Sequence, residues 1–176
     1  MGIGRRTWLW PLRPIARMMC DVLSIRPRSS DDCHLIVSWV PDAEALYLFA
    51  GPRLRWPLTL DQLTVDEQSP ERTAWVVVDA CPEPIGQFEL TMRDGHAHLG
   101  RVLLDPTVRG RGLAHDLVRL AITRARALGA TSIGLNVVTG NRPALRTYER
   151  AGFVGISRQD AVGSLAMTLE LATHVR

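Results

Sequence analysis

The sequence predicts an α/β protein of the α+β type, with a mixed, mostly antiparallel central sheet and helices on both of its faces. Two patterns predict this class. Short runs rich in β-branched residues, separated by turn signals, occupy residues 73–104, and strand and helix patterns then alternate toward the end of the chain. With 176 residues and 46% apolar content, the chain can bury a core of its own. We therefore expect one domain over residues 21–176.

The first elements expected are one strand and two short helices. Residues 22–27 have the composition of a strand, and residues 29–32 are all helix N-cap types, so a helix should follow them. A second helix is expected over residues 43–49, because Pro41-Asp42 restarts a helix there and Gly51-Pro52 stops it.

A loop and three strands are expected next. Residues 52–71 carry many prolines and polar residues, which indicates a loop with one helical turn. The β-rich runs at residues 73–79, 85–92 and 97–104 are separated by turn signals, and Asp94-Gly95 is a typical hairpin turn. These three strands should form an antiparallel meander.

The second half alternates between helices and strands. Apolar residues recur at helical spacing over residues 113–128, and Gly129 should end that helix. Residues 132–138 read as a buried strand, and Asn141 is the N-cap candidate of the next helix. The last two strands are expected at residues 153–158 and 165–171.

Side chains of a regular strand alternate between its two faces, which sorts residues 96–104 into two sets. One face is expected to carry His96, His98, Gly100, Val102 and Leu104, and the other Ala97, Leu99, Arg101 and Leu103.

An Arg/Gly loop leads from this strand into the helix at residue 113. The start of a helix has unpaired N–H groups and a partial positive charge, so it stabilises a phosphate. Gly110 and Gly112 allow a diphosphate to approach the main chain, and Arg109 and Arg111 can bind its oxygens. The loop therefore has the layout of an anion cradle.

Two motifs resemble one known family. Residues 109–114 read Arg-Gly-Arg-Gly-Leu-Ala, and residues 141–153 read Asn-Arg-Pro-Ala-Leu-Arg-Thr-Tyr-Glu-Arg-Ala-Gly-Phe. Together they resemble the Arg/Gln-x-x-Gly-x-Gly/Ala and Asn-x-x-Ala-x-x-x-Tyr-x-x-x-Gly-Phe motifs of the GCN5-related N-acetyltransferase (GNAT) family. The resemblance implies the GNAT fold and the direct transfer of an acetyl group from acetyl-CoA, as co-substrate, to an amine.

The resemblance also implies which residues hold acetyl-CoA. The loop would bind its pyrophosphate, the main chain before Asp105 would pair with its pantetheine arm, and the amide of Leu104 would polarise the thioester carbonyl. The cofactor-binding residues expected on this basis are Val102, Leu103, Leu104, Arg109, Gly110, Arg111, Gly112, Leu113, Ala114, His115 and Asn141.

Tyr148 falls on the family's tyrosine, which protonates the departing thiolate. A phenol with a pKa of about 10 is protonated at neutral pH and can donate. Tyr148 shares a helix face with Ala144 and Ala151, so a packing role is the alternative.

The general base is less defined. His98 stands four residues before Val102, where histone-acetylating members of the family carry a glutamate, and a neutral imidazole can accept a proton. A packed or surface histidine is the alternative, and Glu89 is the next candidate base. Asn136 replaces the glutamate of members that acetylate ribosomal-protein N-termini, which argues against that acceptor.

Other chemistries are excluded or disfavoured. The chain contains no lysine, which a P-loop, a pyridoxal enzyme and a protein kinase all require. His96 and His98 could form a metal pair, but no third ligand stands at a suitable spacing, so we expect no metal. The three cysteines form no Cys-x-x-Cys pair, which favours small buried residues in a reducing, cytoplasmic setting.

The basic character of the chain comes from its start. Residues 1–28 contain six arginines and one acid, so this segment is +5 and, with a total of +3, the remainder is −2. We therefore expect no nucleic-acid partner, and the apolar run at residues 8–12 is too short for a membrane span. Residues 1–20 are either a basic leader arm or the product of an early start codon, since Met18 and Met19 precede the first strand.

The expected partners are acetyl-CoA and an amine-bearing acceptor, either a small molecule or a protein, with a homodimer left open. A different class of function is also left open, namely a non-catalytic acyl-CoA sensor that binds the thioester without turnover.

Overall fold

The computed structural model describes residues 22–64, 69–80, 82–159 and 163–172, so the expected leader and Cys20 and Cys81 lie outside the described residues. The strands are β1 (Ser24–Pro27), β2 (Arg72–Val78), β3 (Pro84–Arg93), β4 (His96–Leu104), β5 (Ser132–Val138), β6 (Val154–Gln159) and β7 (Ser164–Glu170). The helices are α1 (Ser30–Ser38), α2 (Ala43–Ala50), α3 (Leu60–Thr64), α4 (Leu113–Ala127) and α5 (Arg142–Arg150), with short 3-10 turns η1 (Gly51–Arg53) and η3 (Pro106–Val108).

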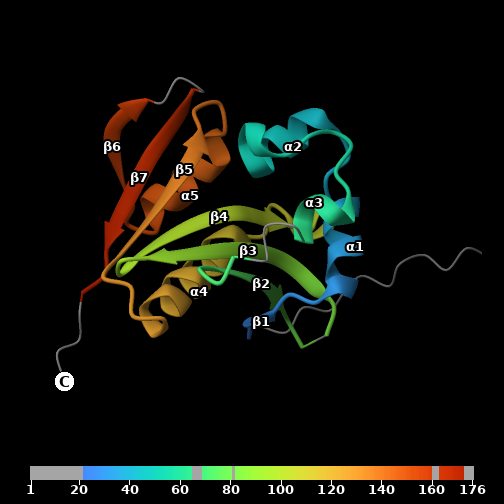
Figure 1. Cartoon of the computed structure of the whole chain (residues 1–176), viewed down its shortest axis with the longest axis horizontal. Coiled ribbons are helices and arrows are strands. Elements are labelled where there is room, and N and C mark those ends of the chain that lie inside the picture. Colours follow the sequence, from blue (N-terminus) through green and yellow to red (C-terminus); the bar gives the residue numbers. More distant parts are fainter. Residues whose placement is uncertain (1–21, 65–68, 81, 160–162, 173–176) are drawn as a thin grey trace, which may run out of the picture.

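Within the described residues, seven strands form one sheet in the order β1-β2-β3-β4-β5-β7-β6. β4 and β5 pair in parallel, whereas the other neighbouring strands pair antiparallel. Helices α4 and α5 lie on one face, and α1, α2 and α3 on the other (Figure 1). The expected mixed sheet with helices on both faces is confirmed, and the expected elements differ from the observed ones only at their ends.

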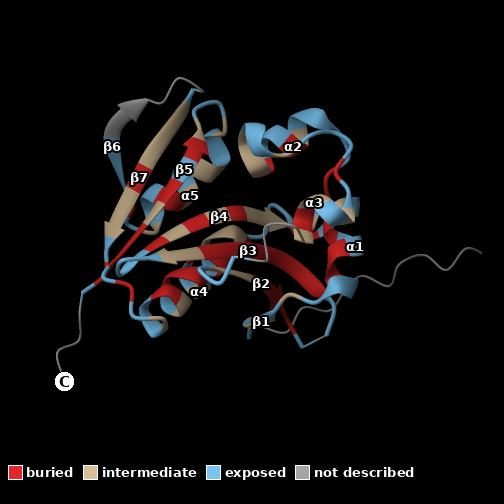
Figure 2. Ribbon diagram, in the orientation of Figure 1, coloured by how far each residue is buried: buried red, intermediate tan, exposed pale blue. Residues whose placement is uncertain are grey.

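The sheet has an apolar core on each face, because its central strands are covered on both sides. On β2, Trp75 and Val77 belong to the core under α4, whereas Val76 and Val78 belong to the core under α1. Figure 2 shows buried residues along β3 and on parts of α1 and α4. An apolar run without clear alternation, as in β2, is what a strand covered on both faces requires.

Local signals set the helix ends. The Ser29 side chain accepts a hydrogen bond from the amide of Asp32, and the Asp32 side chain accepts one from the amide of Ser29, which is a complete capping box at the start of α1. Asp42 caps α2, and Gly129 follows α4 with a φ of +87°. These ends agree with the sequence predictions.

Strand β4 contains a bulge. Gly100 lies opposite Glu89, but Leu103 lies opposite Gln87, so β4 has one more residue than β3 over this interval. Arg101 has a φ of +48°, in the left-handed region. An extra residue with this conformation bends a strand and interrupts its alternation.

The expected alternation of side chains over residues 96–104 is therefore wrong beyond Gly100. Val102 and Leu104 pack with the core under α4, whereas Leu103 packs with the core under α1. Arg101 lines the same cavity as His98, not the face opposite to it. The extra residue in the bulge moves every later side chain to the other face.

Candidate active site

The central feature of the site is the divergence of β4 and β5. The two strands pair only between His96–Leu99 and Ser132–Leu135, and beyond this point they separate (Figure 1). A cleft of about 450 Å³ lies there, which we call the strand cleft. It is lined by the end of β4, the loop before α4 and the start of α4, most of α5, part of α2 and the end of β5.

The loop before α4 forms one wall of the strand cleft. Gly110 and Gly112 have φ values of +79° and +84°, and no heavy atom lies within 4 Å of a Cβ built on either residue. Gly112 is the N-cap of α4, and no side chain caps the helix. Helix amides thus begin beside open space, as an anion cradle requires.

Most residues expected to bind the cofactor line the strand cleft. They are Val102, Leu103, Leu104, Arg109, Gly110, Gly112, Leu113, Ala114 and Asn141. Arg111 and His115 are not among its lining residues. The amide of His115 donates to the Gly112 carbonyl at 3.0 Å, and its Nδ1 is buried without a hydrogen-bond partner.

Arg109 and Asn141 have structural contacts within the cleft. The Nε and Nη2 of Arg109 donate to the Leu104 carbonyl at 3.1 and 3.0 Å, so this guanidinium joins the end of β4 to the loop. The Asn141 side chain accepts a hydrogen bond from the amide of Ala144, which confirms it as the N-cap of α5. Both residues help to shape the cleft.

Tyr148 projects from α5 to the strand cleft. The residue is 8% exposed, and its ring packs edge-on against Phe153 with the ring centroids 5.8 Å apart. Burial raises the pKa of the Tyr148 phenol above its ordinary value of about 10. The hydroxyl is therefore protonated at neutral pH beside the cleft, so packing and proton donation are compatible at this position.

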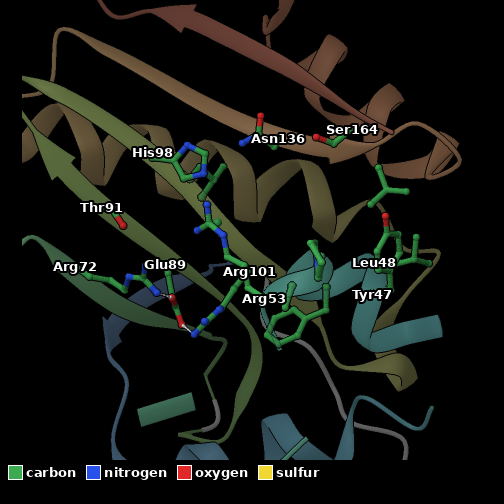
Figure 3. Close-up of a pocket in the computed structure, with 17 residues that line it drawn as sticks. Tyr47, Leu48, Arg53, Arg72, Glu89, Thr91, His98, Arg101, Asn136 and Ser164 are labelled. Carbon is green, nitrogen blue, oxygen red and sulfur yellow. Dashed lines mark hydrogen bonds and ion pairs between the residues drawn. The ribbon is translucent and has the colours of Figure 1, made fainter. Parts of the chain in front are cut away.

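A second cavity of about 270 Å³ adjoins the cleft, and we call it the arginine cavity. It lies between the α2–η1 segment and strands β2 to β5, with side chains from these elements facing it (Figure 3). The two cavities share Leu48, Phe49, Leu99, Gly100, Arg101 and Asn136 in their walls. A molecule in the strand cleft can therefore reach a second molecule in the arginine cavity.

His98 lines the arginine cavity and is half-buried. Burial, together with the positive charges of Arg53 and Arg72, lowers the pKa of its imidazole below the ordinary 6.5. The ring is consequently neutral at pH 7 and able to accept a proton. His98 and Tyr148 lie in different cavities, on either side of the shared wall.

Glu89 is the centre of an arginine cluster. Its Oε1 lies 3.2 Å from Nη1 of both Arg28 and Arg101, and its Oε2 lies 3.6 Å from Nη1 of Arg72. The Glu89 side chain is 4% exposed. Because both carboxylate oxygens are engaged with guanidinium groups, Glu89 is placed as a structural anion and not as the base that the sequence offered as its second candidate.

Arg53, Arg72 and Arg101 were not identified from the sequence as site residues. Arg101 was assigned to the opposite face because a regular strand was assumed. Arg53 and Arg72 come from segments far from the motifs. Arg72 lies opposite Thr91 on β3, two residues along from Glu89, and this proximity depends on the strand register.

The other candidates have different surroundings. The His96 Nδ1 shares a hydrogen bond with the Ser132 hydroxyl. Among the residues that the structure describes, no group of three or more His, Cys, Asp or Glu side chains is placed to hold a metal ion. Within the same residues, no helix has the length and apolar character needed to cross a membrane.

Comparison with known proteins identifies the family of the chain. The model of the acetyltransferase (GNAT) family matches residues 36–153, which include β2 to β5 and the helices that flank the cleft. The chain belongs to the GNAT family. Both motifs, at residues 109–114 and 141–153, contribute residues to the wall of the strand cleft.

Several GNAT proteins are similar over most of their length. The peptidyl-lysine N-acetyltransferase YjaB of Salmonella typhimurium is 32% identical over 140 residues, covering 78% of this chain and 88% of that protein. YjaB of Escherichia coli is 30% identical over 154 residues, covering 86% and 97%. The spermidine N-acetyltransferase of Vibrio cholerae, solved with CoA and spermine, has a TM-score of 0.69 at 20% identity and covers 84% of this chain and 95% of that one.

The family membership establishes the type of reaction. The chain is an acetyltransferase that moves an acetyl group from acetyl-CoA to an amine. The non-catalytic sensor is the less favoured of the two functions that the sequence left open.

Proposed function

We propose that this GNAT enzyme binds acetyl-CoA in the strand cleft and acetylates, without a covalent enzyme intermediate, an amine held in the arginine cavity. One observation carries this proposal. The strand cleft runs from the glycine loop at the start of α4 along Val102–Leu104 to the wall that it shares with the arginine cavity. A long thioester and a small amine can therefore meet at Gly100 and Arg101.

The glycine loop is proposed to hold the pyrophosphate. The main chain at residues 110–114 borders open space, which supports contacts from its amides to phosphate oxygens. Arg109 still has its Nη1 group available after binding the Leu104 carbonyl, so it can both shape the loop and attract the anion. Arg111 and His115 stay predictions from the motif, because neither is among the residues that line the strand cleft.

Backbone direction supports a role for Leu104. The amide of Asp105 donates to the Ile85 carbonyl on β3 at 3.0 Å. Because successive amides of a strand point to opposite sides, the amides of Leu104 and Val102 point away from β3, toward the strand cleft. We assign pairing with the pantetheine arm to Val102–Leu104, and polarisation of the thioester carbonyl to the Leu104 amide.

The proposed reaction balances as follows. The neutral amine nitrogen attacks the thioester carbonyl carbon, and the carbonyl electron pair moves to the oxygen beside the Leu104 amide. When the carbonyl reforms, the C–S bond breaks and its electron pair stays on sulfur. The amine loses one proton, which His98 accepts directly or through water, and the thiolate gains one proton from Tyr148. The products are the acetylated amine and free CoA thiol.

His98 suits the role of base by its position and protonation state. It lines the arginine cavity, where the amine is proposed to bind, and its lowered pKa keeps the imidazole neutral at pH 7. Tyr148 suits the role of acid by its position, because it borders the strand cleft and a phenol is protonated at neutral pH.

Replacing Tyr148 by Phe tests the proposal. We expect the variant to bind acetyl-CoA with unchanged affinity by calorimetry, while thiol release with an amine panel falls roughly 100-fold or more. Thr147→Ser, on the same helix and also beside the cleft, is the matched control and should keep both properties. Absence of thiol release from the unmodified protein across the whole panel, with acetyl-CoA bound, would instead identify a sensor.

The remaining expectations rest on the sequence. A metal-free reaction, a cytoplasmic setting, a single domain over residues 21–176 and the absence of nucleic-acid partners stay predictions, and the choice between monomer and homodimer stays open.

A further inference from the structure

The charge of the arginine cavity carries information about the acceptor. Among the described residues that line it, the positively charged side chains are Arg53, Arg72 and Arg101, and the negatively charged one is Glu89. Arg28, together with Arg72 and Arg101, is ion-paired with Glu89. Within the described lining, positive charge therefore exceeds negative charge by two.

Arg53 differs from the other arginines of this cavity. Arg72 and Arg101 are ion-paired with Glu89, whereas within the described residues no hydrogen bond or ion pair occupies the Arg53 guanidinium. Arg53 ends η1 and is exposed, and its charge is felt at His98. It is thus a cation beside the proposed base, with its hydrogen-bond donors available.

Building on the proposed function, we propose that the acceptor is a small amine that also carries a carboxylate, and that Arg53 binds this carboxylate. A guanidinium offers two parallel donors that match the two oxygens of a carboxylate. The cavity of about 270 Å³ suits an amino-acid-sized molecule rather than a folded protein surface. Arg53 is in this view a specificity-determining residue.

The same charge disfavours cationic acceptors. A polyamine, or a lysine within a basic peptide, would bring a second ammonium group next to Arg53, Arg72 and Arg101. An amino acid instead brings one anion to balance the cavity. Surrounding arginines also lower the pKa of the acceptor ammonium, which favours the neutral amine that attacks.

Matched acceptors test the proposal. The probes are glycine, β-alanine and γ-aminobutyrate, their amides, and diamines of equal length, each assayed for thiol release with saturating acetyl-CoA. We expect kcat/KM of the best carboxylate to exceed that of its amide by roughly tenfold, with the diamine lowest. Arg53→Gln should bring this ratio close to one without changing the KM of acetyl-CoA, and Arg53→Lys should restore part of it.

Controls separate this inference from the proposed function. Arg119→Gln, on the exposed side of α4, should leave the ratio unchanged. Calorimetry of the same probes in the presence of CoA provides a second readout. The unmodified protein should bind the carboxylates more tightly than the diamines, and the Arg53→Gln variant should lose this preference. Binding without turnover would refute the proposed function but support the carboxylate site.

Three results would overturn the inference. The first is a preference of the unmodified protein for diamines over carboxylates in both readouts. The second is an Arg53→Gln variant that keeps the original ratio of kcat/KM between the carboxylate and its amide. The third is better turnover of a peptide with an acidic residue beside its N-terminus than of every free amino acid. The last result would overturn the small acceptor, because the carboxylate would then belong to a polypeptide.

Discussion

The Gln87 side chain is hydrogen-bonded to the bulge residue Arg101: its Nε2 donates to the Arg101 carbonyl at 3.3 Å. Its Oε1 accepts a hydrogen bond of 2.7 Å from Nη1 of Arg28. Gln87 is fully buried, on the strand next to the bulge. One amide side chain therefore joins the backbone of the bulge to the arginine cluster around Glu89.

Replacing Gln87 by Met, which has a similar shape, should remove both hydrogen bonds, while Arg28 keeps its ion pair with Glu89. We expect the free energy of unfolding to fall by about 2 kcal/mol. Urea unfolding followed by circular dichroism measures this change. A loss below roughly 0.5 kcal/mol would show that the bulge does not depend on this side chain.

Gly112 should be needed for acetyl-CoA binding beyond its effect on stability. Its φ of +84° places it in the left-handed region, where a Cβ costs about 1–2 kcal/mol. We expect Gly112→Ala to weaken acetyl-CoA binding roughly tenfold, measured by calorimetry, because the loop amides shift.

Gly129→Ala is the matched control, since its φ of +87° is similar and it follows the opposite end of α4. It should cost comparable stability but leave acetyl-CoA affinity unchanged. Equal affinity of Gly112→Ala and Gly129→Ala for acetyl-CoA would argue against the glycine loop as the pyrophosphate site.

Protonation of His98 should appear as a loss of activity on the acid side of the pH profile, which we call the acid limb. Because the pKa of His98 is lowered by burial and by Arg53 and Arg72, the limb is expected below pH 6.5. Arg72→Gln removes one positive charge and should move the limb to higher pH. The pH dependence of kcat/KM, together with an NMR titration of the His98 ring, checks both expectations.

The same shift has a consequence for folding. Between the folded pKa and 6.5, the unfolded chain binds more protons at this residue than the folded chain, so stability falls as the pH decreases through that range. A His98→Gln variant should lose this part of the pH dependence of stability. For the activity profile, an acid limb that stays at the same pH in Arg72→Gln would show that the arginine charge does not act on His98.

Asp32 should stabilise the fold in a pH-dependent way. Burial raises the pKa of this carboxyl, but hydrogen bonds from Arg26 and Ser29 outweigh that effect and lower the pKa from 3.8 to about 2. The contribution is fully present above pH 3.8 and is lost as the pH falls toward 2. Since the Arg26 side chain is 38% exposed, we expect Asp32→Asn to cost about 1–2 kcal/mol at pH 7.

Asp31 is the matched control, because it lies in the same first turn of α1 but is exposed. Chemical unfolding at pH 7 and at pH 2 should show a loss for Asp32→Asn only at pH 7, and little change for Asp31→Asn at either pH. Equal losses in the two variants would assign the effect to the helix dipole and not to the capping box.

The sequence determined the features that depend on near neighbours in the chain. The caps at Ser29, Asp42 and Asn141, the apolar stripe of α4 and the glycine loop at residues 110–112 could be predicted because turn and cap geometry involves only a few consecutive residues. The mixed, mostly antiparallel character of the sheet, with helices on both faces, was also predicted from its elements and from the family resemblance, whereas the strand order came from the structure.

The tertiary structure decided which side chains meet. The bulge at Arg101 depends on pairing with β3 and on Gln87, so no local pattern in β4 predicts the change of face. The arginine cavity joins Arg53, Arg72 and Arg101 from three separate segments around a buried carboxylate. Charges far apart in sequence act on one another only after folding has brought them within a few ångströms in a medium of low dielectric constant.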